Sequence, residues 1–353
     1  PEYVVFEGPG MDAFAESPEW GGSLVIFPFM YYETYGDDSL IKKYYPNMRR
    51  YVDYLKTRAD KGILSFGLGD WYDYGDFRAG FSRNTPVPLV ATAHYYMTVM
   101  YLVQAAKMVG NDFDIHYYTS LAQDIMVAFN KCFLHKDTAQ YGTGSQCSNA
   151  LPLFLQMTQD ADEQGSYRPD ADLNEKVFAN LIKDVEAHGN RLTTGDVGNR
   201  YLIQTLARNG EHELIYKMFN HEEAPGYGFQ LKFGATTLTE QWDPRQGSSW
   251  NHFMMGQIDE WFFNSLVGIR PSTTPKQGYQ KFIIAPQPVG DLKYVKASYE
   301  TLYGTINVDW TCENGTFTLN VSVPVNTTAV VYLPGEKEPK EIQSGTYQLV
   351  CAK

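Results

Sequence analysis

Cysteine is scarce in this sequence, and the cysteines it has are far apart. Among 353 residues there are four, at positions 132, 147, 312 and 351. They are too few and too scattered for a disulfide framework, and no C-x-x-C or H-E-x-x-H motif occurs, so the sequence predicts no metal site and no cofactor. Cys312 and Cys351 could pair in the C-terminal part, but we expect buried free thiols.

Positive charge and long apolar runs are also lacking. The chain has 29 Lys and Arg against 41 Asp and Glu, a formal net charge of -12. Nucleic acids and anionic membranes bind basic surfaces, so we expect no nucleic-acid partner. No apolar run approaches the roughly 20 residues of a bilayer span, so we expect no membrane span. The chain begins at Pro1 without an initiator methionine or a signal peptide, and we expect a mature product or a piece of something longer.

Aromatic residues, by contrast, are abundant. The chain contains 26 Tyr, 20 Phe and 6 Trp. Flat rings stack on the C–H faces of sugars, and carboxylates accept hydrogen bonds from sugar hydroxyls. Many rings together with excess acid therefore favour a carbohydrate-handling protein, although composition by itself is a weak indication.

Apolar residues at helical spacing dominate the chain up to about residue 270. Short polar or glycine-containing links separate successive helices, which predicts antiparallel hairpins arranged in a closed ring, an (α/α) barrel. A ring of six pairs needs twelve helices, and because the pattern yields only about nine, we expect the native domain to begin before Pro1. The predicted helices cover residues 24–36, 40–59, 88–109, 114–133, 146–157, 173–188, 201–210, 211–220 and 250–266.

Past Pro271 the period changes from helix to strand. Short runs rich in β-branched residues are separated by turns, and residues 316–323 alternate strictly between apolar and polar. The other predicted strands cover residues 283–286, 295–301, 305–310 and 329–333. The fold class is therefore mainly α with a C-terminal β domain: a helical barrel over residues 1–270 and a small β-sandwich over residues 271–353.

The stretch from Phe233 to Gly256 gathers the most chemically useful side chains. An extended run at residues 235–239 leads to Glu240 and Trp242, and Ser248-Ser249 resembles a helix N-cap. The helix that it starts would place three functional side chains in its first turn: Trp250, Asn251 and His252. Functional groups usually lie on such loop ends, although an ordinary surface turn with one acidic residue is an equally good interpretation of this stretch alone.

The long loop at residues 62–84 is the second candidate. It contains Asp70, Trp71 and Asp73, but not the residue order of an EF-hand calcium loop. We predict that Asp70 and Asp73 bind sugar hydroxyls and that Trp71 stacks or packs. A solvated acidic turn is the alternative.

Several motifs, taken in order along the chain, resemble those of the bacterial alpha-L-rhamnosidases of glycoside hydrolase family 78. They are Ser17 to Gly21, Gly67 to Trp71, Leu192 to Gly195, Gly234 to Asp243, Asn251-His252 with Gly256, Gly278-Tyr279 and Ile284 to Pro286. Each motif is weak alone, but their order over nearly the whole chain makes the match fairly specific. The resemblance implies an (α/α)6 catalytic barrel, inversion at the anomeric carbon and a rhamnose-containing glycan or glycoside as substrate.

The resemblance also implies roles for individual residues. Glu240 would be the general base, His252 would lie near the rhamnose beside Asn251, and three residues would line the sugar pocket: Trp20, Asp70 and Trp71. The family's general-acid glutamate belongs to an acidic cluster upstream of the Ser-Pro-Glu-Trp motif, and this chain lacks that cluster. We therefore expect the acid upstream of Pro1, and the in-chain candidates, which do not match it, are Glu16, Glu19, Asp70 and Asp73. Members of the family often act in the periplasm or outside the cell.

Two other interpretations compete with a glycosidase. A non-catalytic glycan-binding fragment would keep the aromatic pocket without an acid. Another (α/α)6 enzyme, of a phosphorolytic or lyase type, ranks lower because the sequence shows no basic phosphate site.

Overall fold

The computed structural model describes residues 16–161, 167–272 and 275–352. These residues divide into two compact units, each built from several segments. Of the described residues, the first contains those within 16–27, 41–205 and 218–255, and the second contains those within 28–40, 206–217 and 256–352. The second unit takes in two helical segments besides the C-terminal region, so the division predicted between residues 270 and 271 stays a prediction.

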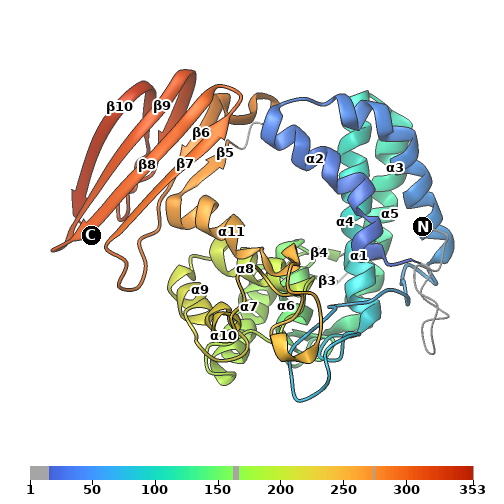
Figure 1. The fold of residues 1–353 in the computed structure, drawn as a ribbon. Helices are drawn as coiled ribbons and strands as arrows, with labels where there is room; N and C mark the ends of the chain where they lie inside the picture. Colours follow the sequence, from blue (N-terminus) through green and yellow to red (C-terminus); the bar gives the residue numbers. More distant parts are fainter. Residues whose placement is uncertain (1–15, 162–166, 273–274, 353) are drawn as a thin grey trace. The chain divides into compact units, whose positions relative to one another are not determined.

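Helices dominate the chain up to residue 267, as the periodicity predicts (Figure 1). They are α1 (Pro18–Gly21), α2 (Ser23–Tyr35), α3 (Ser39–Arg58), α4 (Val87–Val109), α5 (Asp112–Phe133), α6 (Gln146–Phe154), α7 (Ala171–Ala187), α8 (Gly198–Arg208), α9 (His212–Phe219), α10 (Tyr227–Lys232) and α11 (Ile258–Trp261). Two short strand pairs interrupt them, β1 (Leu134–His135) with β2 (Gln140–Tyr141) and β3 (Gln159–Ala161) with β4 (Tyr167–Pro169).

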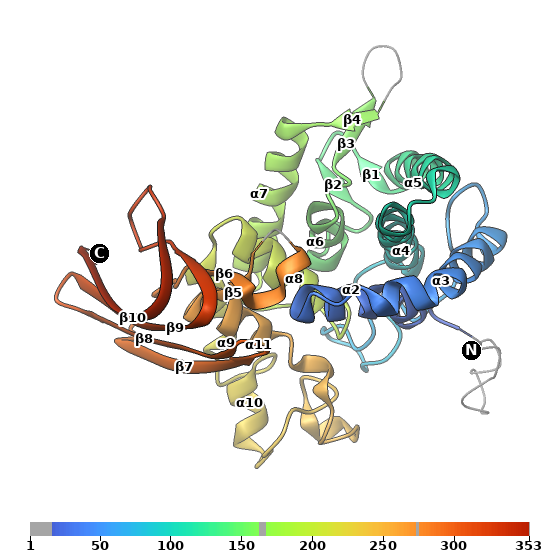
Figure 2. The same cartoon turned by 90° about the horizontal axis from the view of Figure 1, so that it is seen from above.

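The tightest helical hairpin of the first unit joins α4 to α5. Gly110 ends α4 with φ of 73°, and Asn111 caps α5 by accepting a 3.1 Å hydrogen bond from the backbone N–H of Asp114. Helix α3 lies near both (Figure 2) and contacts α5, where Tyr45 donates to Asp114 and Tyr118 donates to Asp53. Antiparallel packing of successive helices is therefore confirmed for this part of the chain.

The stretch around Glu240 folds differently from our prediction. Residues 235–239 form no strand, and the predicted helix 250–266 starts only at Ile258, after a 3₁₀ turn, η2 (Phe253–Met255). The backbone N–H of Glu240 donates to Ser249, and that of His252 donates to Leu238, both at 2.9 Å. These bonds hold two irregular segments side by side, so the residues after Ser249 cannot enter a helix.

The C-terminal β domain is confirmed. Its strands are β5 (Ile269–Pro271), β6 (Lys281–Ile284), β7 (Tyr294–Thr301), β8 (Gly304–Glu313), β9 (Thr316–Val331) and β10 (Lys340–Ala352). The two runs predicted at 316–323 and 329–333 belong to one strand, β9, and β5 and β10 were not predicted.

Hydrogen bonds connect all six of these strands into one sheet, in which β9 has a central place. Its first half pairs with β8, its second half pairs in parallel with β6, and β10 runs antiparallel along both. The inward residues of the two halves, including Phe282, Trp310 and Phe317, share one buried core. The halves of the predicted sandwich are therefore joined through β9 and β10 rather than being separate sheets.

Candidate active site

The first unit contains a pocket of about 450 Å³ with mostly aromatic walls. That volume suits a small ligand. Three of its side chains can carry charge: Asp196, Glu240 and His252. The remainder of the wall is Trp20, Leu68, Trp71, Tyr72, Phe81, Phe253 and Met254. Four residues predicted from sequence, Trp20, Trp71, Glu240 and His252, are thus brought together from segments far apart in the chain.

Glu240 is held by the irregular segment opposite it. One oxygen, Oε2, accepts a 3.1 Å hydrogen bond from the backbone N–H of Ser249, and the backbone N–H of Glu240 donates in return to the Ser249 carbonyl. This reciprocal pair of hydrogen bonds fixes the position of the carboxylate.

His252 presents a polar edge that no protein group satisfies. Its ring stacks on Phe253 at 5.9 Å between centroids and 21° between planes. Within the part of the chain that the structure describes, Nδ1 is buried and has no hydrogen-bond partner. A buried polar atom without a partner costs stability, so its retention is consistent with a partner supplied by a ligand.

The ring of Trp71 is fixed by edge contacts with two other aromatic residues of the wall. Its centroid lies 4.9 Å from that of Tyr72 and 5.2 Å from that of Phe81, at angles of 66° and 86°. The backbone N–H of Tyr72 donates to Gly80 at 2.8 Å, which closes the loop on itself. The wall is therefore preorganised, and a bound ligand need not order it.

Asp196 is the functional residue that sequence reasoning missed. It lies in the Thr-Thr-Gly-Asp turn before α8, a motif that the sequence analysis used only for family resemblance. Its backbone N–H donates to Trp71 at 2.7 Å, and the residue is 3% exposed. Burial, with the nearby carboxylates of Asp70 and Glu240, raises its pKa to about 9, so Asp196 is protonated at neutral pH.

Asp70 and Asp73 are buried and do not line the pocket, which corrects the direct sugar contact predicted for them. Asp70 Oδ1 accepts a 2.6 Å hydrogen bond from the backbone N–H of Gly198, the first residue of α8, and burial raises its pKa to about 7. Asp73 Oδ2 accepts from the N–H groups of Arg83 and Asn84, at 2.7 and 2.6 Å. Both carboxyls therefore shape the loops around the pocket rather than its interior.

Three more predicted site residues are also outside the pocket wall. Trp242 is fully buried, and its Nε1–H donates to the Thr194 carbonyl at 3.3 Å. Trp250 is 43% exposed and donates to the Pro244 carbonyl at 3.1 Å. Asn251 is exposed. Trp242 therefore supports the turn that carries Asp196, and the roles predicted for Trp250 and Asn251 have no support in their placement.

The remaining acid candidates, Glu16 and Glu19, accept hydrogen bonds outside the pocket wall. Glu19 Oε1 accepts a 3.0 Å hydrogen bond from the backbone N–H of Gly69, and Glu16 accepts one of 2.8 Å from Tyr51. Burial raises the pKa of Glu19 to about 7. Neither is among the pocket-lining residues, so neither is placed to protonate a ligand there.

Comparison with known proteins assigns the family. Residues 1–266 match the bacterial alpha-L-rhamnosidase 6 hairpin glycosidase domain, and residues 268–348 match the bacterial alpha-L-rhamnosidase C-terminal domain. The chain belongs to the bacterial alpha-L-rhamnosidase family. The resemblance predicted from the motifs is confirmed, and so is the helical barrel followed by a β domain.

Individual rhamnosidases match nearly the whole chain but are much longer. An alpha-L-rhamnosidase of Streptomyces avermitilis is 28% identical over 92% of this chain and 30% of its own length. An alpha-L-rhamnosidase of Formosa agariphila is 29% identical over 94% of this chain and 35% of its own length. The solved alpha-L-rhamnosidase of Dictyoglumus thermophilum superposes with a TM-score of 0.84 at 29% identity, over 98% of this chain and 41% of that one. The solved S. avermitilis alpha-L-rhamnosidase complexed with L-rhamnose superposes with a TM-score of 0.81 at 25% identity, over 94% of this chain and 33% of that one. This chain therefore spans about a third of the curated relatives it matches.

Neither a metal cluster nor a membrane-crossing helix is found in the described residues. No group of three or more His, Cys, Asp or Glu side chains there is placed to hold a metal ion. No helix there is both long and apolar enough to cross a bilayer.

Proposed function

We propose that this chain carries the sugar pocket of a glycoside hydrolase that releases terminal alpha-L-rhamnose from glycosides or polysaccharides. One observation carries the proposal: Glu240, fixed by Ser249, shares an aromatic pocket with a histidine whose Nδ1 lacks a protein partner. Sugars need rings for their C–H faces and polar atoms for their hydroxyls, and this pocket offers both. The S. avermitilis relative solved with L-rhamnose supports the choice of sugar.

Glu240 is the proposed general base. Ser249 occupies Oε2, which leaves Oε1 to take a proton from water as that water attacks the anomeric carbon. Such a reaction inverts the anomeric configuration, and it needs a second carboxyl about 6.5 to 9.5 Å away to protonate the leaving oxygen. Inversion is therefore part of the proposal.

We propose that the general acid comes from outside this chain, as the family motifs imply. Asp196 is the one other carboxyl that lines the pocket among the described residues. Catalytic acids work best with a pKa near the working pH, and a pKa of about 9 makes Asp196 a reluctant proton donor. A protonated Asp196 is better suited to donating a hydrogen bond to a sugar hydroxyl. The site of action that we propose is the periplasm or the cell exterior.

The test is Glu240→Gln in the full enzyme, with Glu186→Gln, an exposed residue of α7, as the matched control. Turnover of 4-nitrophenyl alpha-L-rhamnoside should fall by at least about 100-fold for Glu240→Gln, because general-base catalysis contributes that much. The melting temperature and binding of L-rhamnose should hardly change. Proton NMR of the wild-type reaction should show the inverted anomer first.

Near-normal turnover in Glu240→Gln would reject Glu240 as the base, and a retained anomer would reject inversion. A glycan-binding function without catalysis is the second candidate, and the high pKa of Asp196 favours it for the chain by itself. Calorimetric binding of L-rhamnose by the isolated chain without hydrolysis would identify that state.

A further inference from the structure

A second pocket of about 730 Å³ lies in the same unit. It is lined by the loop after Tyr72, the loop that ends at the N-cap of α6, the C-terminal end of α7, the segment before α8 and the segment before α10. The side chains that matter for the argument are Tyr74, Phe77, Arg83, Asp184, His188 and Arg191. None of the family motifs or the predicted site residues falls on these six.

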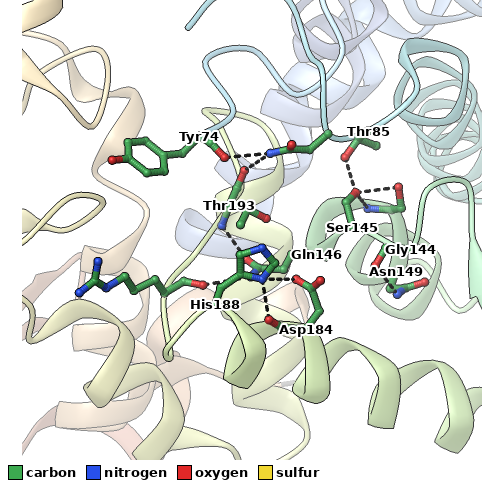
Figure 3. Close-up of polar contacts among 12 residues, drawn as sticks. Tyr74, Thr85, Gly144, Ser145, Gln146, Asn149, Asp184, His188 and Thr193 are labelled. Carbon is green, nitrogen blue, oxygen red and sulfur yellow. Dashed lines mark hydrogen bonds and ion pairs between the residues drawn. The ribbon is translucent and has the colours of Figure 1, made fainter. Parts of the chain in front are cut away.

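The walls of this second pocket are fixed by two amide side chains (Figure 3). Gln146 is fully buried; its Oε1 accepts from the Thr193 N–H at 2.8 Å, and its Nε2 donates to the Arg191 carbonyl at 3.0 Å. Asn84 Nδ2 donates to the carbonyls of Tyr74 and Thr193, both at 3.0 Å. Two side chains thus tie three segments together, so the pocket is preformed.

Polar groups with spare capacity face this space. His188 Nδ1 donates to the backbone carbonyl of Asp184 at 2.7 Å, which leaves the rest of a half-exposed ring available. Asp184 Oδ2 lies 3.3 Å from the same nitrogen and forms an ion pair with the ring when that ring is protonated, so Asp184 positions His188. The guanidinium of Arg83 lies over Phe77 at 5.4 Å and, within the described ranges, forms no ion pair.

The charge balance of the pocket indicates a neutral ligand. The lining contains two arginines, Arg83 and Arg191, and two aspartates, Asp76 and Asp184, so their formal charges cancel. Arg191 also forms an ion pair with Glu223. An anion such as a phosphate would require a positive excess, which this lining does not have. Aromatic rings beside mixed donors and acceptors instead suit a hydroxyl-rich, uncharged sugar.

The two pockets share one pair of backbone segments. The Tyr74 N–H donates to Thr193 at 3.1 Å, and the Asp196 N–H donates to Trp71 at 2.7 Å. Trp71 and Asp196 line the first pocket, whereas Tyr74 and Thr193 line the second. On each segment only two or three residues separate the lining of one pocket from the lining of the other, and extended chain of that length spans at most about 7 to 11 Å. Both pockets therefore lie within reach of one oligosaccharide.

We propose that the second pocket binds the sugar to which rhamnose is attached, a neutral monosaccharide on the leaving-group side of the scissile bond. This inference rests on the proposed function, because it takes the first pocket as the rhamnose site. It predicts that the enzyme favours a rhamnosyl disaccharide over rhamnose alone, with His188 and Tyr74 supplying the difference.

Binding to Glu240→Gln tests this without turnover. Calorimetry with L-rhamnose and with two rhamnosyl-glucose disaccharides, rutinose and neohesperidose, should show at least one disaccharide bound about 10-fold more tightly than rhamnose. Adding His188→Ala or Tyr74→Ala should remove that gain and leave L-rhamnose affinity unchanged within about 2-fold. His116→Ala, on the exposed face of α5, is the matched control.

The outcomes separate the two proposals. If L-rhamnose binds but neither disaccharide binds more tightly, or if His188→Ala and Tyr74→Ala both leave the gain intact, the second pocket is not a sugar site. Parallel loss of rhamnose and disaccharide binding in both variants would also overturn it. If L-rhamnose itself does not bind, the proposed function fails, and disaccharide binding sensitive to His188→Ala would still support a sugar site in the second pocket.

Discussion

The protonation of Asp196 gives a quantitative test of the pocket electrostatics. Its pKa is about 9 in the folded protein, against 3.8 for an ordinary aspartate. Between these two pH values the folded protein holds one proton more than the unfolded chain. The stability that protonated Asp196 contributes to the folded protein is therefore fully present below about pH 4. This contribution falls by about 1.4 kcal/mol per pH unit as the pH rises, and it is lost above the folded pKa.

Asp196→Asn removes this titration while keeping the size and the hydrogen-bonding capacity of a neutral carboxyl. From about pH 5.5 to about pH 7.5 the free energy of unfolding of the wild type should fall, relative to the variant, by about 3 kcal/mol. Urea unfolding followed by tryptophan fluorescence at both pH values measures the difference. Glu19 and Asp70, whose pKa values are raised to about 7, titrate in both proteins and cancel.

Asp137→Asn, on the exposed turn between β1 and β2, controls for removing a carboxyl. A difference between Asp196→Asn and wild type that stays constant with pH, or that shifts toward the wild type as pH rises, would show that Asp196 is ionised in the folded protein. Donation of a hydrogen bond from Asp196 to a sugar hydroxyl would then be refuted as well.

Two further predictions concern packing and the thiols. Trp242→Ala should lower the free energy of unfolding by about 3 to 5 kcal/mol because the ring is fully buried. Trp250→Ala, at a half-exposed ring, should lower it by about 1 kcal/mol or less. Urea unfolding measures both changes, and losses of similar size would contradict the burial argument. Cys312 on β8 and Cys351 on β10 are both the strand-register partners of Phe317, on opposite sides of β9. Two strand spacings therefore separate them by about 10 Å, which is beyond disulfide reach. Intact mass under non-reducing conditions should show free thiols, and a reductant should leave the melting temperature unchanged.

Local sequence signals predicted much of the helical part because local interactions determine it. The stop at Gly110 and the cap at Asn111 set the turn between α4 and α5, and both are readable from neighbouring residues. The expectation of buried thiols at Cys312 and Cys351 was wrong, because both are half-buried in the structure. Strand β10 was not predicted because its residues are exposed or half-buried, so its sequence shows little alternation between apolar and polar positions.

The active site shows where such local signals end. Glu240 and His252 both line the pocket, yet the helix predicted over residues 250–266 begins only at Ile258, because the N–H of Ser249 donates to the Glu240 carboxylate and that of His252 to Leu238. A sequence that reads as a helix N-cap is thus used to anchor the carboxylate nine residues earlier.

Asp70 and Asp196 show the same limit in reverse. Their chemical type is visible in the sequence, but the side of the loop on which each lies is decided by contacts more than a hundred residues away. Asp70 accepts from the first N–H of α8 and so becomes structural, while the turn that α8 follows places Asp196 in the pocket beside Glu240. Burial, together with the nearby carboxylates of Asp70 and Glu240, raises the pKa of Asp196 and keeps it protonated at neutral pH. The protonation of Asp196 therefore comes from contacts made by the fold, not from the motif that contains it.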